Sequence, residues 1–142
     1  MTLTDVPGPD PDAIARYVTE TYPDAVIGRA EGAMFFSIDE SHWPNFATIV
    51  TGAAFDDGSN LSRPGVFRLN IGALSRDTFQ RLVGDLADPD FTELDKLHPH
   101  PLYAKQRWVA ILNPGKGSFE TFVKPLLAET HERVAAQQRR SG

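Results

Sequence analysis

The strand-like segment 66–71 carries the side chains best suited to binding chemistry. Side chains alternate across a strand, so Phe67, Leu69 and Ile71 would face a core while Arg68 and Asn70 share the opposite side. A guanidinium offers a forked donor and an amide offers both a donor and an acceptor, which suits a small anionic or amide-bearing molecule. An ordinary solvent-facing strand has the same pattern, so both interpretations stay open. On either one, Arg68→Ala should change stability little.

Two imidazoles flank Pro99 in the segment 97–103 and form the second candidate. Proline holds the backbone extended, so His98 and His100 should project in related directions. Two histidines supply at most half of a tetrahedral zinc shell and the chain has no cysteine, so we predict no metal site. The open alternatives are turn hydrogen bonds, or a role for His100 in contacting a ligand or transferring a proton near neutral pH.

Three helices are predicted around these segments. Asp10, followed by a proline, is typical of a helix start, and Ser75 can cap a second helix that ends at Gly84. Ser118 can cap a C-terminal helix with apolar residues at three- and four-residue spacing. Pro125 lies inside that pattern and either kinks the helix or marks its true start.

Strands alternate with these helices in an order that indicates the fold class. The predicted strands are residues 26–30, 33–38, 46–51, 66–71 and 107–112. The order predicts an α+β fold, with a single antiparallel sheet of about five strands and helices packed on one face. We expect one domain over residues 1–142, with residues 1–9 and 138–142 flexible.

The composition of the chain limits the kinds of binding partner that we expect. The chain has 142 residues, 19 acidic against 14 basic side chains and a formal net charge of −5, which disfavours binding to a polyanion such as duplex DNA. The N-terminal residues lack the pattern of a signal peptide, and no apolar run could span a bilayer. We therefore predict a cytoplasmic protein with no cofactor, no nucleic-acid partner and no membrane partner.

Four runs of sequence resemble an uncharacterised bacterial family, domain of unknown function 6194. They are residues 46–51, 63–72, 99–104 and 108–114. The order of elements is more distantly similar to the YjbR and MmcQ group, whose fold resembles that of the bacterial frataxin CyaY. This resemblance implies an antiparallel sheet packed against helices and no established activity; YjbR proteins are described as DNA-binding on fold analogy alone. The matching polar positions are Arg63, Arg68, Asn70, His100, Tyr103, Trp108 and Asn113.

The leading hypothesis is a binding or accessory domain that holds a small molecule or a peptide against the polar side of the sheet. The predicted ligand-binding residues are Arg63, Arg68, Asn70, His100, Tyr103 and Trp108. The alternative is a cofactor-independent enzyme in which His100 moves a proton while Arg68 and Asn70 stabilise developing negative charge. A YjbR-like DNA-binding protein is the third hypothesis, and the acidic charge disfavours it.

Overall fold

A six-stranded antiparallel sheet forms the body of the protein, with strand order β1-β2-β3-β4-β6-β5. The computed structural model describes residues 8–30, 32–38, 44–51, 65–86 and 89–141. The strands are β1 (Val26–Ala30), β2 (Ala33–Ser37), β3 (Asn45–Val50), β4 (Arg68–Ile71), β5 (His98–Pro99) and β6 (Val109–Leu112). This confirms the α+β class, and the strand beyond the expected five is β5.

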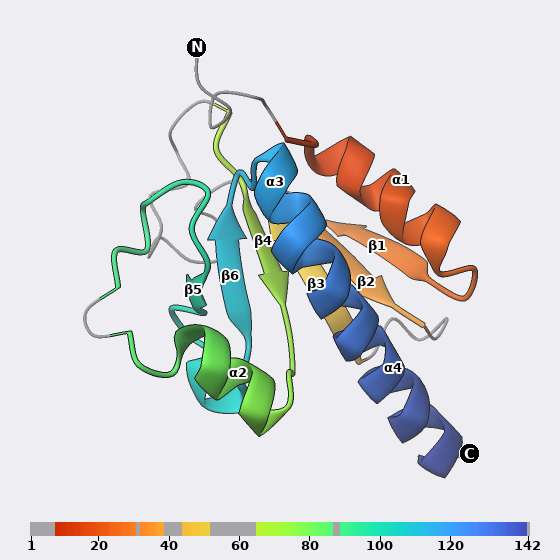
Figure 1. Ribbon diagram of the computed structural model, residues 1–142. Coiled ribbons are helices and arrows are strands. Elements are labelled where there is room, and N and C mark those ends of the chain that lie inside the picture. The colour runs from red at the N-terminus through yellow and green to blue at the C-terminus, as the bar shows by residue number, and fades with distance from the viewer. Residues whose placement is uncertain (1–7, 31, 39–43, 52–64, 87–88, 142) are drawn as a thin grey trace.

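The helices gather on one face of this sheet. They are α1 (Pro11–Thr21), α2 (Arg76–Val83), α3 (Lys116–Ser118) and α4 (Lys124–Ser141), with a 3₁₀ turn η2 (Ala104–Gln106) and a π-helical turn η3 (Phe119–Val123). Figure 1 shows α1 and α4 crossing in front of the sheet while α2 lies at one end of β4 and β6. Among the described residues, none of the helices is long and apolar enough to cross a bilayer.

Two of the three predicted N-caps, Asp10 and Ser75, are confirmed. Asp10 Oδ1 accepts the backbone N–H of Ala13 at 2.8 Å, and Ser75 Oγ accepts that of Thr78 at 3.1 Å. Glu129 of α4 adds a contact that the sequence pattern did not predict. Its carboxylate accepts the Ser75 backbone N–H at 2.9 Å and the Thr78 hydroxyl at 2.7 Å. A carboxylate is favourable at the positive end of a helix, so Glu129 fixes α2 against α4.

The C-terminal helical segment begins before the predicted cap. Gly115 is the N-cap of α3, and its backbone N–H is bound by Asp95 Oδ1 at 2.8 Å, so Ser118 lies inside the helical segment and caps nothing. Pro125 is the second residue of α4, and only Lys124 separates it from the π-helical turn 119–123. A proline has no N–H to donate and its ring crowds the preceding turn, so a wider π turn at this point accommodates it.

The main core lies between the sheet and α1 and α4. Leu69 and Ile71 of β4 are fully buried there, together with Ile14, Val18 and Leu127 from the helices. The predicted alternation of β4 is therefore confirmed on its apolar side. Arg68 and Asn70 must point to the opposite face of the sheet, away from α1 and α4.

Candidate functional site

Arg68 and Asn70 are buried on that opposite face. Their side chains are 1% and 2% exposed, respectively, so the solvent-facing interpretation of this strand is wrong. Arg68 Nε donates to Asn70 Oδ1 at 2.8 Å, and Asn70 Nδ2 donates to Thr48 Oγ1 at 2.9 Å. Both ends of the Asn70 amide are thus occupied, as burial of a polar group requires.

Strand register places a histidine on the same face. Asn70 pairs with Thr48 on β3 and with Ala110 on β6, and Ala110 pairs in turn with His98 on β5. Directly paired residues of an antiparallel sheet point to the same side. We use the term polar face for this side of the sheet, defined by Thr48, Arg68, Asn70 and His98.

Apolar neighbours make the surroundings of Arg68 poor in water. Arg68 pairs with Val50 on β3 and Leu112 on β6, which form a small apolar cluster with Val66. A charge in such surroundings is costly unless hydrogen bonds hold it, so removing Asn70 should destabilise the fold. Removing Arg68 should also destabilise it, because this leaves a void and takes the donor from Asn70 Oδ1. This burial replaces the earlier expectation that Arg68→Ala would change stability little.

The His98 imidazole is 2% exposed, packs edge-on against the Phe91 ring at 5.2 Å between centroids, and has one hydrogen-bond partner among the described residues. Its Nδ1 lies 3.0 Å from the carbonyl oxygen of Pro99. Because a carbonyl only accepts, Nδ1 carries the hydrogen and Nε2 is left as an acceptor. Nε2 is buried and has no hydrogen-bond partner within the described part of the chain. Burial lowers the pKa of His98 below its usual 6.5 and nearby Arg68 adds to this, while the Pro99 hydrogen bond and the charges of Asp90 and Glu93 oppose it.

His100 has a different environment from His98. Its Nδ1 accepts the backbone N–H groups of Leu102 at 3.0 Å and Tyr103 at 3.1 Å, and its ring is 4% exposed. These bonds require an unprotonated Nδ1, so the His100 ring holds the turn that follows it. The ring centroid also lies 4.8 Å from that of Tyr103 and 6.4 Å from that of Trp108.

The predicted site residues therefore form two groups. Arg68 and Asn70 are bonded to each other, while His100, Tyr103 and Trp108 form a ring cluster nearer the other end of the strands. Trp108 packs over Gly72, where a Cβ atom would come within 1.7 Å of the indole, and Tyr103 is 51% exposed. Arg63, the remaining predicted ligand-binding residue, lies outside the described residues.

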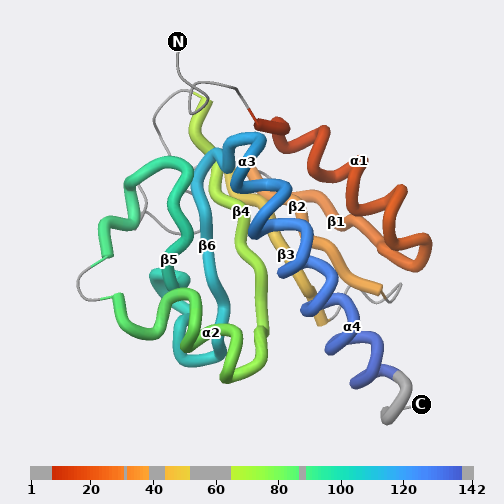
Figure 2. The backbone as a smooth tube through the Cα atoms, viewed as in Figure 1, coloured from red at the N-terminus to blue at the C-terminus, as the bar shows by residue number. Residues whose placement is uncertain are grey.

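A cavity of about 250 Å³ opens beside His98. We call it the His98 cavity; it is lined by Leu86, Pro89, Asp90, Glu93, Lys96, Leu97 and His98. Residues 89–97 run along the outer margin of the molecule beside β6 before the chain reaches β5, as Figure 2 shows. A bridge between Leu94 and Leu112 fastens this segment to β6.

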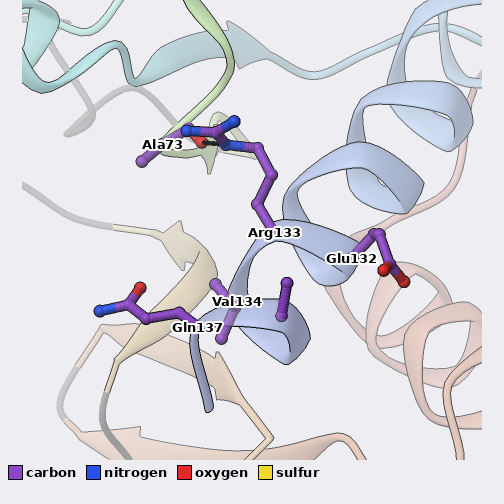
Figure 3. Close-up of a pocket in the computed structure, with 6 residues that line it drawn as sticks. Ala73, Glu132, Arg133, Val134 and Gln137 are labelled. Carbon is purple, nitrogen blue, oxygen red and sulfur yellow. Dashed lines mark hydrogen bonds between the residues drawn. The ribbon is translucent and has the colours of Figure 1, made fainter. Parts of the chain in front are cut away.

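A second cavity, of about 280 Å³, lies against the C-terminal part of α4. Figure 3 shows Arg133 reaching to Ala73, whose carbonyl accepts the Arg133 Nε–H at 2.9 Å, while Glu132 leaves the helix in another direction. The polar groups of this cavity do not converge, and neither buried side-chain atom that lacks a hydrogen-bond partner in the described part of the chain belongs to its lining. The His98 cavity is thus the better candidate.

Metal ligation has no support in the described part of the chain. No three histidine or carboxylate side chains gather there in an arrangement that could hold a metal ion. Asp90, which lines the His98 cavity, instead uses Oδ1 to accept the backbone N–H of Thr92 at 2.9 Å and its hydroxyl at 2.6 Å. These two bonds orient the Asp90 carboxylate.

Sequence reasoning missed the contribution of Thr48 and of the acidic segment that precedes His98. It also gave more weight to His100 than to His98. The two histidines lie two residues apart, so a strand at this position would have placed both on the polar face. The signal was weak because β5 has only two residues, one of them a proline, which is tolerated at a sheet edge.

The fold and site define a class of protein: a small α+β domain with helices on one face of its sheet and a buried polar row on the other. The chain belongs to the family of unknown function DUF6194, whose model matches residues 9–142. No curated protein matches the chain, and no solved structure matches it either.

Proposed function

We propose that this protein is a binding domain that holds a small molecule against the polar face of its sheet. The observation that carries the proposal is the His98 Nε2 acceptor, buried and without a partner among the described residues, in a side chain that lines a cavity. A buried acceptor without a hydrogen bond costs about 1–3 kcal/mol. A ligand that donates to Nε2 would recover this loss on binding.

The neighbouring polar residues support the site from within the sheet. Arg68 donates a hydrogen bond to Asn70, and Asn70 donates one to Thr48, so these bonds hold the three side chains in place on the polar face. Arg68 is too deeply buried to serve as the exposed, forked anion donor that the sequence suggested. We therefore assign Arg68 to positioning and place ligand contact at the His98 cavity, whose volume suits a small molecule better than a peptide.

Catalysis has less support than binding. The two backbone N–H groups that donate to His100 Nδ1 engage that nitrogen in the turn. The distant similarity to the YjbR group, the bacterial origin, the cytoplasmic location and the absence of nucleic-acid binding remain predictions. The absence of a cofactor remains a prediction as well.

A fragment screen by two-dimensional NMR tests the proposal. The screen contains small amines, carboxylates, amides and alcohols, and the readout is the set of backbone and histidine side-chain signals that shift. We expect binders whose shifts centre on Glu93, Leu97 and His98. As a control, Leu102→Ala alters an exposed side chain outside the cavity and should leave their affinity unchanged. Binders that shift only the α4 cavity, or no binder at millimolar concentration, would contradict the proposal.

A further inference from the structure

The charges at the His98 cavity select among small molecules. Two carboxylates, Asp90 and Glu93, and one ammonium group, Lys96, line it. Lys96 Nζ lies 3.9 Å from Glu93 Oε2, and both side chains are at least half exposed, so this pair belongs to the outer part of the cavity. With His98 neutral, the lining carries a net negative charge, which favours a cation and repels an anion.

The buried His98 ring has the opposite preference. Arg68 is close enough to disfavour a positive charge on the His98 ring. A ligand's ammonium group is therefore better placed at the carboxylates than at the ring. The group that meets His98 Nε2 should be a neutral donor, because an unprotonated ring nitrogen can only accept.

Apolar side chains complete the lining. Leu86, Pro89 and Leu97 form the apolar part of the lining, and Leu86 is 41% exposed. Such a surface suits a hydrocarbon body, while the few polar groups set its orientation.

We propose that the His98 cavity binds a small organic cation with an apolar body, whose neutral hydroxyl or amide donor bonds to His98 Nε2 while its ammonium group faces Asp90 and Glu93. This inference rests on the proposed function and specifies the ligand class of the same site. Asp90 also accepts two hydrogen bonds from Thr92, so replacing it would disturb the local structure as well as the charge. Glu93 is half exposed and is therefore the better position for a variant that removes a charge.

Three matched probes test both ends of the site. Tyramine carries a hydroxyl group and an aminoethyl group on one aromatic ring, phenethylamine lacks the hydroxyl, and para-hydroxyphenylacetate has a carboxylate in place of the terminal aminomethyl group. We expect tyramine to bind tightest and phenethylamine about three- to tenfold more weakly, the range of one neutral hydrogen bond. The carboxylate probe should bind weakest, and saturating tyramine should shift the ¹⁵N signal of His98 Nε2.

Two variants and a control locate the contacts. His98→Leu should abolish the preference for tyramine over phenethylamine. Glu93→Gln should weaken both amines about two- to fivefold, as expected for an exposed ion pair. Glu120→Gln removes the same charge from a carboxylate that pairs with Lys124 at 2.7 Å in the C-terminal helical segment, and should change neither affinity. If His98→Leu does not fold, Glu93→Gln and the probe series on the parent chain still decide the question.

Three outcomes would overturn the inference: equal affinity for tyramine and phenethylamine, tighter binding of the carboxylate probe, or an Nε2 signal that does not respond. If other fragments still shift signals around His98, the proposed binding function stands and only the ligand class is wrong. If no compound shifts them, the binding function fails too.

Discussion

Arg68 and Asn70, two residues apart on β4, are joined by a hydrogen bond of 2.8 Å from the guanidinium Nε to the amide oxygen. Residues two apart on a strand share a face, so the bond runs along the strand and leaves the ladder bonds to β3 and β6 intact. Both side chains are buried, so the Arg68 donor and the Asn70 acceptor satisfy each other where little water is available.

Arg68→Ala should destabilise the protein about as much as Leu69→Ala, although the two side chains lie on opposite faces of the sheet. Leu69→Ala leaves a core cavity and should cost about 2–5 kcal/mol. Arg68→Ala leaves a comparable void and removes the donor to Asn70, with a cost in the same range. Urea denaturation measures both. An Arg68 variant that unfolds at nearly the parent midpoint would mean that the side chain is not held as described.

Asn70→Ala should cost about 2–4 kcal/mol, because it removes a hydrogen-bond acceptor from the buried Arg68 and a donor from the half-buried Thr48. Thr48→Val, which removes only the acceptor of one bond, should cost less. The double variant should be more stable than the sum of the two losses predicts, since both single changes break the same bond. Thr51→Ala, at an exposed position past the end of β3, is the control and should stay within about 0.5 kcal/mol of the parent.

His98 should make stability pH-dependent on the acidic side. Its pKa is lowered in the folded chain, so below the ordinary value of 6.5 the unfolded chain binds a proton that the folded chain does not. Stability should therefore be unaffected by His98 above this value and fall as pH drops from there toward the folded-state pKa. The measurement is the difference in unfolding free energy between parent and His98→Gln across this range. A difference that does not vary with pH would contradict the buried, neutral imidazole.

Gly72→Ala should destabilise strongly, because its Cβ would lie 1.7 Å from a ring carbon of Trp108. The indole must move, and we expect a loss of about 1–3 kcal/mol with a change in tryptophan fluorescence. In a Trp108→Leu background the same change should cost less. Gly117→Ala, in α3 with open space around the new methyl group, serves as the matched control and should not destabilise.

Duplex DNA should bind weakly. With a net charge of −5, affinity at physiological salt should be no better than roughly 10⁻⁴ M, the non-specific range. Fluorescence anisotropy with a short labelled duplex provides the measurement. Submicromolar binding with a steep dependence on salt would favour the DNA-binding hypothesis instead.

Local features of the sequence determined much of the fold. The two-residue alternation of segment 66–71 placed Leu69 and Ile71 in the core, and side-chain oxygens at Asp10 and Ser75 marked two helix starts. These features depend on backbone geometry and on neighbours a few residues away, which the sequence shows directly. The same alternation put Arg68 and Asn70 together on the other face.

Only the tertiary structure decided what that other face is. Whether Arg68 meets water or apolar side chains depends on Val50 and Leu112, which strands distant in sequence bring beside it. Strand β5, and with it the place of His98, exists because β6 pairs with it, since two residues have no periodicity of their own. Burial and hydrogen-bond partners depend on contacts between segments that are remote in sequence. Alternation alone does not distinguish a buried row of polar side chains from a solvent-exposed one.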